Sequence, residues 1–309
     1  MASLNAWILN AIFRFTMKRH GDRGIDLPRA RVRSQQPPAR AMYVPPDMRV
    51  DEIEPEPGLR FDVADTKAAR TGEPAAIVYY LHGGGYFFGS PKTHRQINLA
   101  LARAAGGPGY SLDYRLAPEH PYPAAVDDAL RGYRWLLAKH PRARIIIAGD
   151  SAGGGLALAT MLAARAAKLP LPAAFIGYSP WTDLAVTGDS VAHNAGRCAM
   201  FTPKGIHAAA KLYLGDADPR DPLASPLYGD LAGLPPMLLF ASRDEILHHD
   251  TTRLAAKAKA AGVCVELIEK DRLPHVWPIF VRLLPEGGEA LKTAEAFMAR
   301  VVTQAKAAA

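Results

Sequence analysis

The sequence predicts an α/β fold, in which helices flank a mostly parallel central sheet. Three observations lead to this prediction. From residue 76 onward, short apolar runs alternate with longer Ala- and Leu-rich runs, as expected of βαβ units. The chain of 309 residues, 49% of them hydrophobic, is long enough to bury one large core. Two glycine-rich runs directly follow two strand candidates, at the edge where open α/β sheets build their sites.

Short apolar runs mark the strand candidates. Two of them are joined across Pro55-Glu56-Pro57-Gly58, which predicts an antiparallel hairpin at the start of the sheet. A further strand follows Gly106-Gly107-Pro108-Gly109 and is expected to start late, because proline lacks a ladder donor. The expected strands are residues 48–54, 59–64, 76–81, 144–148, 237–241 and 263–268, with another ending at Tyr178. The expected helices are residues 94–105, 124–140, 151–168, 250–261 and 286–305.

The run Gly149-Asp150-Ser151-Ala152-Gly153 matches G-x-S-x-G, the strand-turn-helix elbow that presents a serine hydroxyl. It lies between a buried strand candidate and an Ala-rich helix candidate, which is the order that the elbow requires. Glycines at its two ends keep side chains away from a strained turn. Ser151 is therefore a candidate nucleophile, and the alternative is a structural serine in a glycine-rich turn.

The run His82-Gly83-Gly84-Gly85 follows the strand candidate at residues 76–81. Glycines allow a loop to turn its N–H groups toward one point, which is what an oxyanion hole requires. The alternative is a flexible loop after a strand. His82 suits a hydrogen bond that shapes this loop better than the role of catalytic base.

A serine nucleophile needs a base and an acid that orients it, and in α/β-hydrolases, where this elbow occurs, the chain order is Ser, Asp or Glu, His. Asp244 follows the strand candidate at residues 237–241, and His275 lies beyond the next one. Each also has a structural reading: Asp244 as a helix cap and His275 as a packed loop residue. Glu245 is the second candidate acid. Weaker base candidates, in segments that are expected to be helical, are His207, His248 and His249.

The chain resembles the bacterial hormone-sensitive lipase family of esterases, in the subgroup with a GDSAG elbow, from about residue 76 to 301. The segments that carry the resemblance, besides the two glycine runs, are Asp113-Tyr114-Arg115-Leu116-Ala117-Pro118-Glu119, Tyr178-Ser179-Pro180-Trp181, Asp221-Pro222-Leu223-Ala224-Ser225-Pro226 and Leu273-Pro274-His275-Val276-Trp277. The resemblance implies an α/β-hydrolase fold with a helical cap, ester hydrolysis, and neither metal nor cofactor.

By this similarity Ser151 is the nucleophile, His275 the base and Asp244 the acid. The N–H groups of Gly83, Gly84 and Ala152 would form the oxyanion hole. The chain departs from the family after Asp244: the usual Asp-Pro-Leu-x-Asp is replaced by Asp-Glu-Ile-Leu-His. We therefore expect the acid loop to be supported by other contacts than in the family.

The resemblance also implies a division of the chain. Residues 1–46 are expected to form a first cap segment and residues 189–229 an inserted second one. Residues 47–188 and 230–309 would form the catalytic domain. Aromatic and Met side chains after the glycine loop and in the cap predict a pocket for short or medium acyl chains, although they would equally suit a cap core. These candidates are Tyr86, Phe87, Phe88, Met200, Phe201 and Tyr213.

The net charge of +7 lies mostly at the N-terminus, where residues 1–46 hold eight basic and two acidic side chains. Leu4, Trp7, Ile8, Ala11, Ile12 and Phe15 fall on one helical face there. A cap helix with a solvated basic face is the favoured reading over contact with an anionic membrane. No nucleic-acid partner and no stable membrane insertion are expected, because no apolar run approaches the length of a span.

Two cysteines without metal-ligand spacing favour a cytoplasmic protein with reduced thiols. The adjacent residues His248, His249 and Asp250 make a poor metal site, because neighbouring side chains on a helix point apart. Family analogy leaves a homodimer open. The resulting hypothesis is a serine carboxylesterase that acts on small-molecule, short- to medium-chain esters through an acyl-enzyme. The alternatives are an amide, carbamate or lactone hydrolase, and a non-catalytic small-molecule receptor, against which His275 argues.

Overall fold

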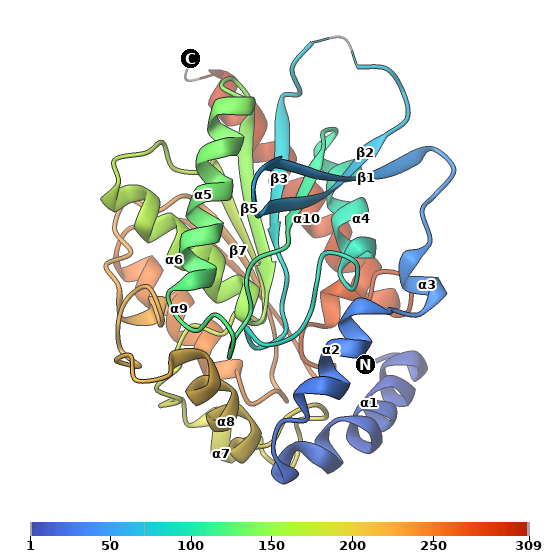
Figure 1. The fold of residues 1–309 in the computed structure, drawn as a ribbon, viewed down its shortest axis with the longest axis vertical. Coiled ribbons are helices and arrows are strands. Elements are labelled where there is room, and N and C mark those ends of the chain that lie inside the picture. The colour runs from blue at the N-terminus through green and yellow to red at the C-terminus, as the bar shows by residue number, and fades with distance from the viewer. Residues whose placement is uncertain (1, 71, 308–309) are drawn as a thin grey trace.

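The computed structural model describes residues 2–70 and 72–307. Within them the strands form one eight-stranded sheet with the order β1-β2-β4-β3-β5-β6-β7-β8 (Figure 1). The pairs β1–β2 and β2–β4 are antiparallel and all later pairs are parallel, which confirms the predicted fold class. The strands are β1 (Met48–Glu56), β2 (Leu59–Thr66), β3 (Ala76–Leu81), β4 (Gly109–Leu112), β5 (Arg144–Asp150), β6 (Ala174–Tyr178), β7 (Met237–Ser242) and β8 (Val265–Lys270).

Alternate side chains of the central strands enter two hydrophobic layers, as the pleat of a strand requires. On β3, Ile77, Tyr79 and Leu81 pack into one layer, and Val78 and Tyr80 pack into the other. The first layer is covered by α5 (Ala124–Lys139), α6 (Ala152–Ala166) and α9 (His248–Ala260). The second is covered by α4 (Arg95–Ala105) and α10 (Pro285–Ala307). Both faces of the sheet are therefore buried, which explains the continuous apolar runs of its strands.

The expected elements are present, and their ends differ by a few residues. Strand β4 begins at Gly109, directly after Pro108, as the missing proline N–H predicts. Strand β5 continues through Asp150, so that the strand delivers its chain directly to Ser151. Helix α9 begins at His248, two residues before the expected start.

Short helices from two separate parts of the chain cover the carboxyl ends of the strands, at the lower side of Figure 1. The first group contains α1 (Leu4–Thr16), the 3-10 helix η1 (Lys18–Arg23), α2 (Leu27–Gln35) and α3 (Ala39–Met42). The second contains α7 (Ser190–His193), α8 (Pro203–Leu214) and the 3-10 helix η2 (Pro226–Tyr228). A last 3-10 helix, η3 (Trp277–Ile279), follows the base loop.

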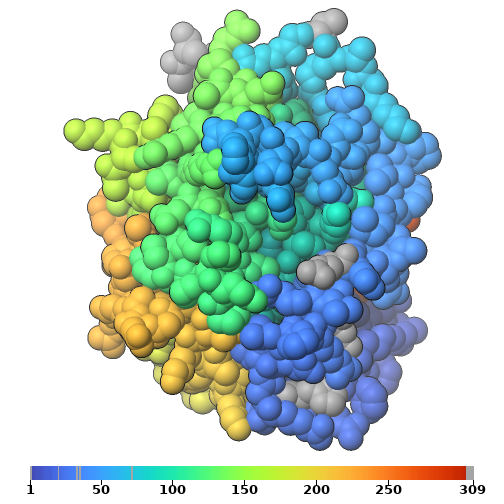
Figure 2. All heavy atoms as spheres, in the orientation of Figure 1, coloured from blue at the N-terminus to red at the C-terminus, as the bar shows by residue number. Residues whose placement is uncertain are grey.

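The two groups contact each other directly, and Figure 2 shows the N-terminal segment lying against the segment near α8. Lys18 Nζ donates to the carbonyls of Ala195 and Cys198, at 2.6 and 2.7 Å. Arg14 donates to the carbonyls of Gly196 and Arg197, at 3.0 and 2.6 Å. The cationic side chains of α1 and η1 thus bind the chain that leaves α7.

Candidate active site

Ser151 occupies the sharp turn between β5 and α6. Its backbone has φ 51° and ψ −123°, in the left-handed region that ordinary residues avoid, and its N–H donates to Tyr178 O at 2.9 Å. The flanking glycines are required by close packing. A Cβ on Gly149 would lie 2.4 Å from Gly153 O, and a Cβ on Gly153 would lie 2.1 Å from Leu81 O. The predicted elbow is present and holds Ser151 at the end of the strand.

His275 is paired with Glu245. The Nδ1–H of the imidazole donates a hydrogen bond to Glu245 Oε2, and the second carboxylate oxygen accepts the N–H of Ser242 at 2.9 Å. Both side chains are buried, at 2% and 1% exposure. A carboxylate held in this way fixes the tautomer that leaves Nε2 free to accept a proton.

Asp244, the acid expected from the sequence, does not contact His275. Its carboxylate accepts the N–H of Arg272 and lies 3.9 Å from Arg197 Nε. It borders a separate, charged cleft of about 860 Å³ that does not include Ser151. The expectation for Asp244 was wrong by one residue, because after β7 the chain turns Asp244 outward and Glu245 inward. The only clue in the sequence was the altered run after Asp244, where Glu245 replaces the usual proline.

Ser151 and His275 line one cleft of about 780 Å³. His275 Nε2 is buried and has no hydrogen-bond partner among the described residues. The Phe201 ring meets the imidazole edge-on, with 5.0 Å between ring centroids. In unliganded enzymes the bond between base and nucleophile is often long and tightens when substrate binds. The unpaired nitrogen is therefore available to the proton of a nucleophile in this cleft.

The glycine loop places two of its three glycines on the same cleft. Gly84 and Gly85 line it together with Ser151. Gly83 does not line the cleft, and its N–H already donates to Asp150 Oδ1 at 2.9 Å. The expectation that Gly83 is an oxyanion donor is thus not met. Ala152 N begins α6, where a first-turn N–H has no partner within the helix.

Asp150 holds the glycine loop in place. Besides Gly83 N–H it accepts the Tyr80 hydroxyl at 2.7 Å, and it lies 3.3 Å from His94 Nε2. Burial lowers the pKa of His94, but the charge of Asp150 and the hydrogen bonds to Asp150 and to Ser90 O together outweigh this, so the pKa is raised. Burial raises the pKa of Asp150, but His94 and the hydrogen bonds hold it below its usual range. These pKa shifts favour an ion pair of the two side chains at the cleft.

His82 bonds its own loop, as its position in the sequence indicates. Its Nδ1 lies 2.8 Å from Gly83 O, and its ring stacks on Tyr114 at 4.2 Å between centroids. Burial, followed by the charge of His94, lowers the pKa of His82 to about 3. The ring is neutral at ordinary pH and packs as part of the core beneath the site.

Four of the six expected pocket residues line the cleft: Phe87, Phe88, Met200 and Phe201. Tyr86 and Tyr213 do not, and for them the pocket prediction was wrong. Their rings stack on each other at 3.8 Å, and both are at most 2% exposed, so they form core beneath the cap. A pattern of aromatic residues cannot distinguish these two environments.

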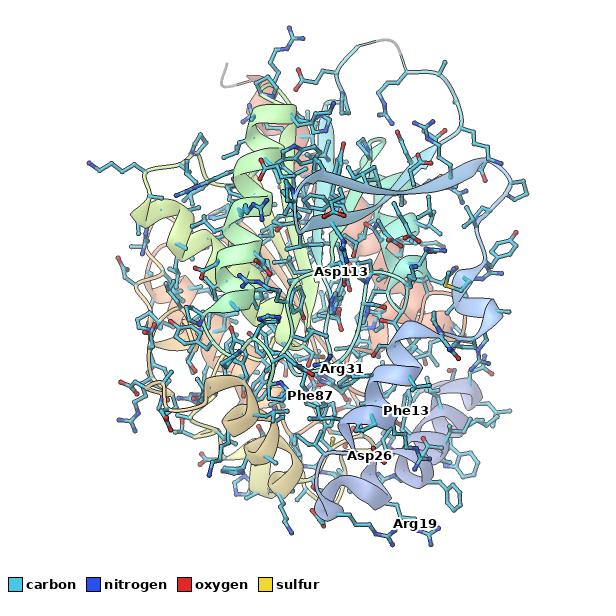
Figure 3. The ribbon with its side chains drawn as sticks, viewed as in Figure 1. Phe13, Arg19, Asp26, Arg31, Phe87 and Asp113 are labelled. Atoms are coloured by element: carbon cyan, nitrogen blue, oxygen red, sulfur yellow. The ribbon has the colours of Figure 1, made fainter. Side chains whose placement is uncertain are left out.

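The sequence did not predict the wall that the N-terminal segment contributes. Phe13, Met17 and Ile25 line the cleft from α1 and the turns after it. Arg31 on α2 secures this wall, because it donates to Phe87 O and to Glu119, each at 2.6 Å (Figure 3). The amphipathic pattern of residues 4–15 was visible in the sequence, but it did not reveal which side faces the cleft.

The remaining candidates have structural partners. His248 Nε2 lies 2.7 Å from Glu269 Oε1, and Asp250 accepts the N–H groups of Thr182 and Asp183, each at 2.9 Å. In the part of the chain that the structure describes, no three His, Cys, Asp or Glu side chains are grouped to hold a metal ion. Within the same residues, no helix has the length and apolarity needed to cross a membrane.

The chain is similar to known proteins in both sequence and structure. Residues 78–279 match the family model of the α/β-hydrolase fold. An acetyl-hydrolase of Streptomyces hygroscopicus is 46% identical over 220 residues, which cover 71% of this chain and 74% of that protein. The carboxylesterase NlhH of Mycobacterium tuberculosis is 32% identical over 285 residues, which cover 86% of each chain.

Solved structures extend the similarity over nearly the whole chain. The crystal structure of EstE5 soaked with p-nitrophenyl butyrate is 38% identical, with a TM-score of 0.88 over 98% of this chain and 100% of EstE5. An esterase from the bacterial hormone-sensitive lipase family has the same identity and TM-score, over 98% of this chain and 99% of that one.

Proposed function

Because the chain belongs to the bacterial hormone-sensitive lipase family of α/β hydrolases and is a carboxylic-ester hydrolase, we propose that it cleaves short- to medium-chain acyl esters through an acyl-enzyme. One observation carries the proposal: Ser151, the free face of His275 and the glycine loop border a single cleft. Each of the three parts supplies one requirement of acyl transfer to a serine.

In the first step His275 Nε2 accepts the Ser151 proton while Oγ attacks the ester carbonyl. Glu245, in the role expected of Asp244, holds the imidazole through Nδ1–H and stabilises the charged ring that forms. The alcohol then leaves with the proton from Nε2. Water, activated by the same nitrogen, hydrolyses the acyl-enzyme and regenerates Ser151.

The tetrahedral oxyanion receives hydrogen bonds from Gly84, Gly85 and Ala152. Gly85 takes the role that the family resemblance implied for Gly83, whose N–H is already bound to Asp150. Removing a donor of this kind costs about 3 kcal/mol of transition-state stabilisation. Asp150 is a positioning residue for these donors, because it fixes the start of the glycine loop.

The cleft fits an acyl chain of limited length. Its volume of about 780 Å³ lies within the range of small-molecule sites, and apolar side chains form most of its wall. Residues 1–46 and 189–229 act as the cap in this proposal, because both supply side chains to the cleft. Phe201 stands beside the base and would limit the space for the acyl group.

Hydrolysis of p-nitrophenyl esters from acetate to laurate tests both the reaction and the chain length. We expect the highest kcat/KM at butyrate to octanoate and an initial burst of p-nitrophenol equal to the enzyme concentration. Ser151→Ala should abolish the burst and labelling by a fluorophosphonate. A Ser151→Ala variant with the wild-type rate would refute the serine mechanism, and a rate that rises through laurate would refute the chain-length assignment.

A further inference from the structure

The outer face of α1 exposes a stripe of large apolar side chains. Trp7 and Phe15 are 70% and 67% exposed, which is unusual for residues of their size. The stripe consists of Leu4, Trp7, Ile8, Ile12 and Phe15. The other exposed large hydrophobic residues of the described chain lie in the same N-terminal segment or on a loop that it contacts: Val32, Tyr43 and Leu283.

The stripe is exposed although α1 is firmly docked. At its start, Ser3 N and Oγ donate to Glu286, at 2.7 and 3.0 Å. On its inner side Ala6 is fully buried, and Phe13 packs against Phe280 with 5.7 Å between ring centroids. The helix therefore has a partner for one face, and its apolar outer face is left for something else.

Positive charge lies at the carboxyl end of this face and along the neighbouring cleft. Arg19 lies over the Phe15 ring, with 5.2 Å to its centroid, and points away from the body of the molecule at the lower edge of Figure 3. Arg23 and Arg29 follow in the chain and line the cleft beside this helix. All three arginines are exposed, and none forms a salt bridge among the described residues. Asp22 and Asp26 are the acidic residues nearby, and Asp26 is engaged as the N-cap of α2.

We propose that this face docks reversibly on an anionic lipid bilayer. Aromatic and aliphatic side chains on one face of a helix enter the interface between headgroups and acyl chains, and flanking arginines bind anionic headgroups. The same helix lines the active-site cleft through Phe13 and Thr16, and Met17, directly after it, does so too. Docking would therefore bring the rim of the cleft to the lipid surface, where apolar esters concentrate.

The test measures binding of the full-length protein to sucrose-loaded vesicles by co-sedimentation. We expect binding to phosphatidylcholine vesicles that contain 30% phosphatidylglycerol, weak binding to pure phosphatidylcholine, and a loss of binding in high salt, which screens the arginines. Trp7 reports the contact directly, because Trp181 and Trp277 are 1% exposed and the half-buried Trp135 lies on α5, away from α1. Brominated lipids should therefore quench Trp7 selectively.

Two variants separate the apolar and the charged contributions. Trp7→Ser combined with Phe15→Ser should lower the vesicle partition coefficient by at least about tenfold. Arg19→Glu should lower it by about fivefold or more, and only for anionic vesicles. Arg134→Glu on α5 is the matched charge control, because Arg134 is exposed on another part of the surface. Hydrolysis of water-soluble p-nitrophenyl acetate should be unchanged in all variants, which reports on folding.

Three results would overturn the proposal. One is equal binding to neutral and anionic vesicles. Another is unchanged binding by the Trp7→Ser/Phe15→Ser variant. The third is a wild-type dimer in light scattering that binds no vesicles and becomes a monomer of 33.3 kDa in that variant, since the face would then be an interface between two copies of the chain. The vesicle measurement does not depend on the proposed ester specificity.

Discussion

Replacing Glu245 by Gln tests which of two neighbouring carboxylates serves the base. The amide oxygen can still accept the Ser242 N–H, so the loop after β7 should keep its conformation. The amide nitrogen would face His275 Nδ1 as a donor and would require that atom to be an acceptor. The ring proton would then reside on Nε2, where it blocks transfer from Ser151. The matched control is Asp244→Asn, at a residue that contacts Arg272 N and not the base.

The size of the effect follows from this geometry. Among the described residues, the only hydrogen-bond partner of His275 Nδ1 is Glu245, and both side chains are at most 2% exposed. Water therefore cannot restore the correct tautomer. The same exchange in a serine protease triad lowers kcat by about 10⁴-fold, or about 5 kcal/mol in the activation barrier. We expect a loss of about 10³- to 10⁴-fold for Glu245→Gln and no more than about threefold for Asp244→Asn.

The assay is steady-state hydrolysis of p-nitrophenyl butyrate, with thermal unfolding as the check on structure. Glu245→Gln should change kcat strongly and KM little, since the carboxylate does not line the cleft. If Asp244→Asn loses activity and Glu245→Gln retains it, the pairing of Glu245 with His275 does not operate in catalysis.

Three further predictions concern the surroundings of the site. Asp150→Asn should lower kcat by about tenfold and Asp150→Ala by about a hundredfold, because only Asn keeps an acceptor for Gly83 N–H. Equal rates for the two variants would contradict this role of Asp150. Phe201→Ala should shift the preference among p-nitrophenyl esters toward longer chains, and an unchanged chain-length profile would place the limit elsewhere. Burial raises the pKa of Asp250 to about 8, so the folded state holds a proton that the unfolded state loses near pH 4. The free energy of unfolding of the wild type, relative to that of Asp250→Asn, should therefore fall between about pH 4 and 8. A difference between the two proteins that stays constant over this range would refute the assignment.

The sequence predicted those parts of the molecule that depend on local patterns. The continuous β-branched run before Gly149 and the alanine-rich run after Ser151 specify a strand and a helix by themselves. Their order left little freedom for the position of the nucleophile. His275 was identified for a similar reason, because it follows the last strand.

What the sequence left open depends on which way individual side chains face. Asp244 and Glu245 are adjacent and differ by one methylene, and only the turn after Ser242 decides which one reaches His275. Tyr86 and Phe87 are also adjacent, yet one is core and the other lines the cleft. Such choices are made by packing between elements that are distant in the chain, which a local pattern does not contain.

The attachment of the first helix has a consequence for how the protein responds to heat. Lys18 and Arg14 hold α1 to carbonyls about 180 residues away, and Glu286 holds its start, whereas the sheet does not include this segment. The N-terminal segment can therefore detach in a partial unfolding event while the sheet remains folded. Detachment would remove one wall of the cleft. Thermal inactivation and sensitivity to proteases near the N-terminus should then appear at a lower temperature than the loss of β-structure.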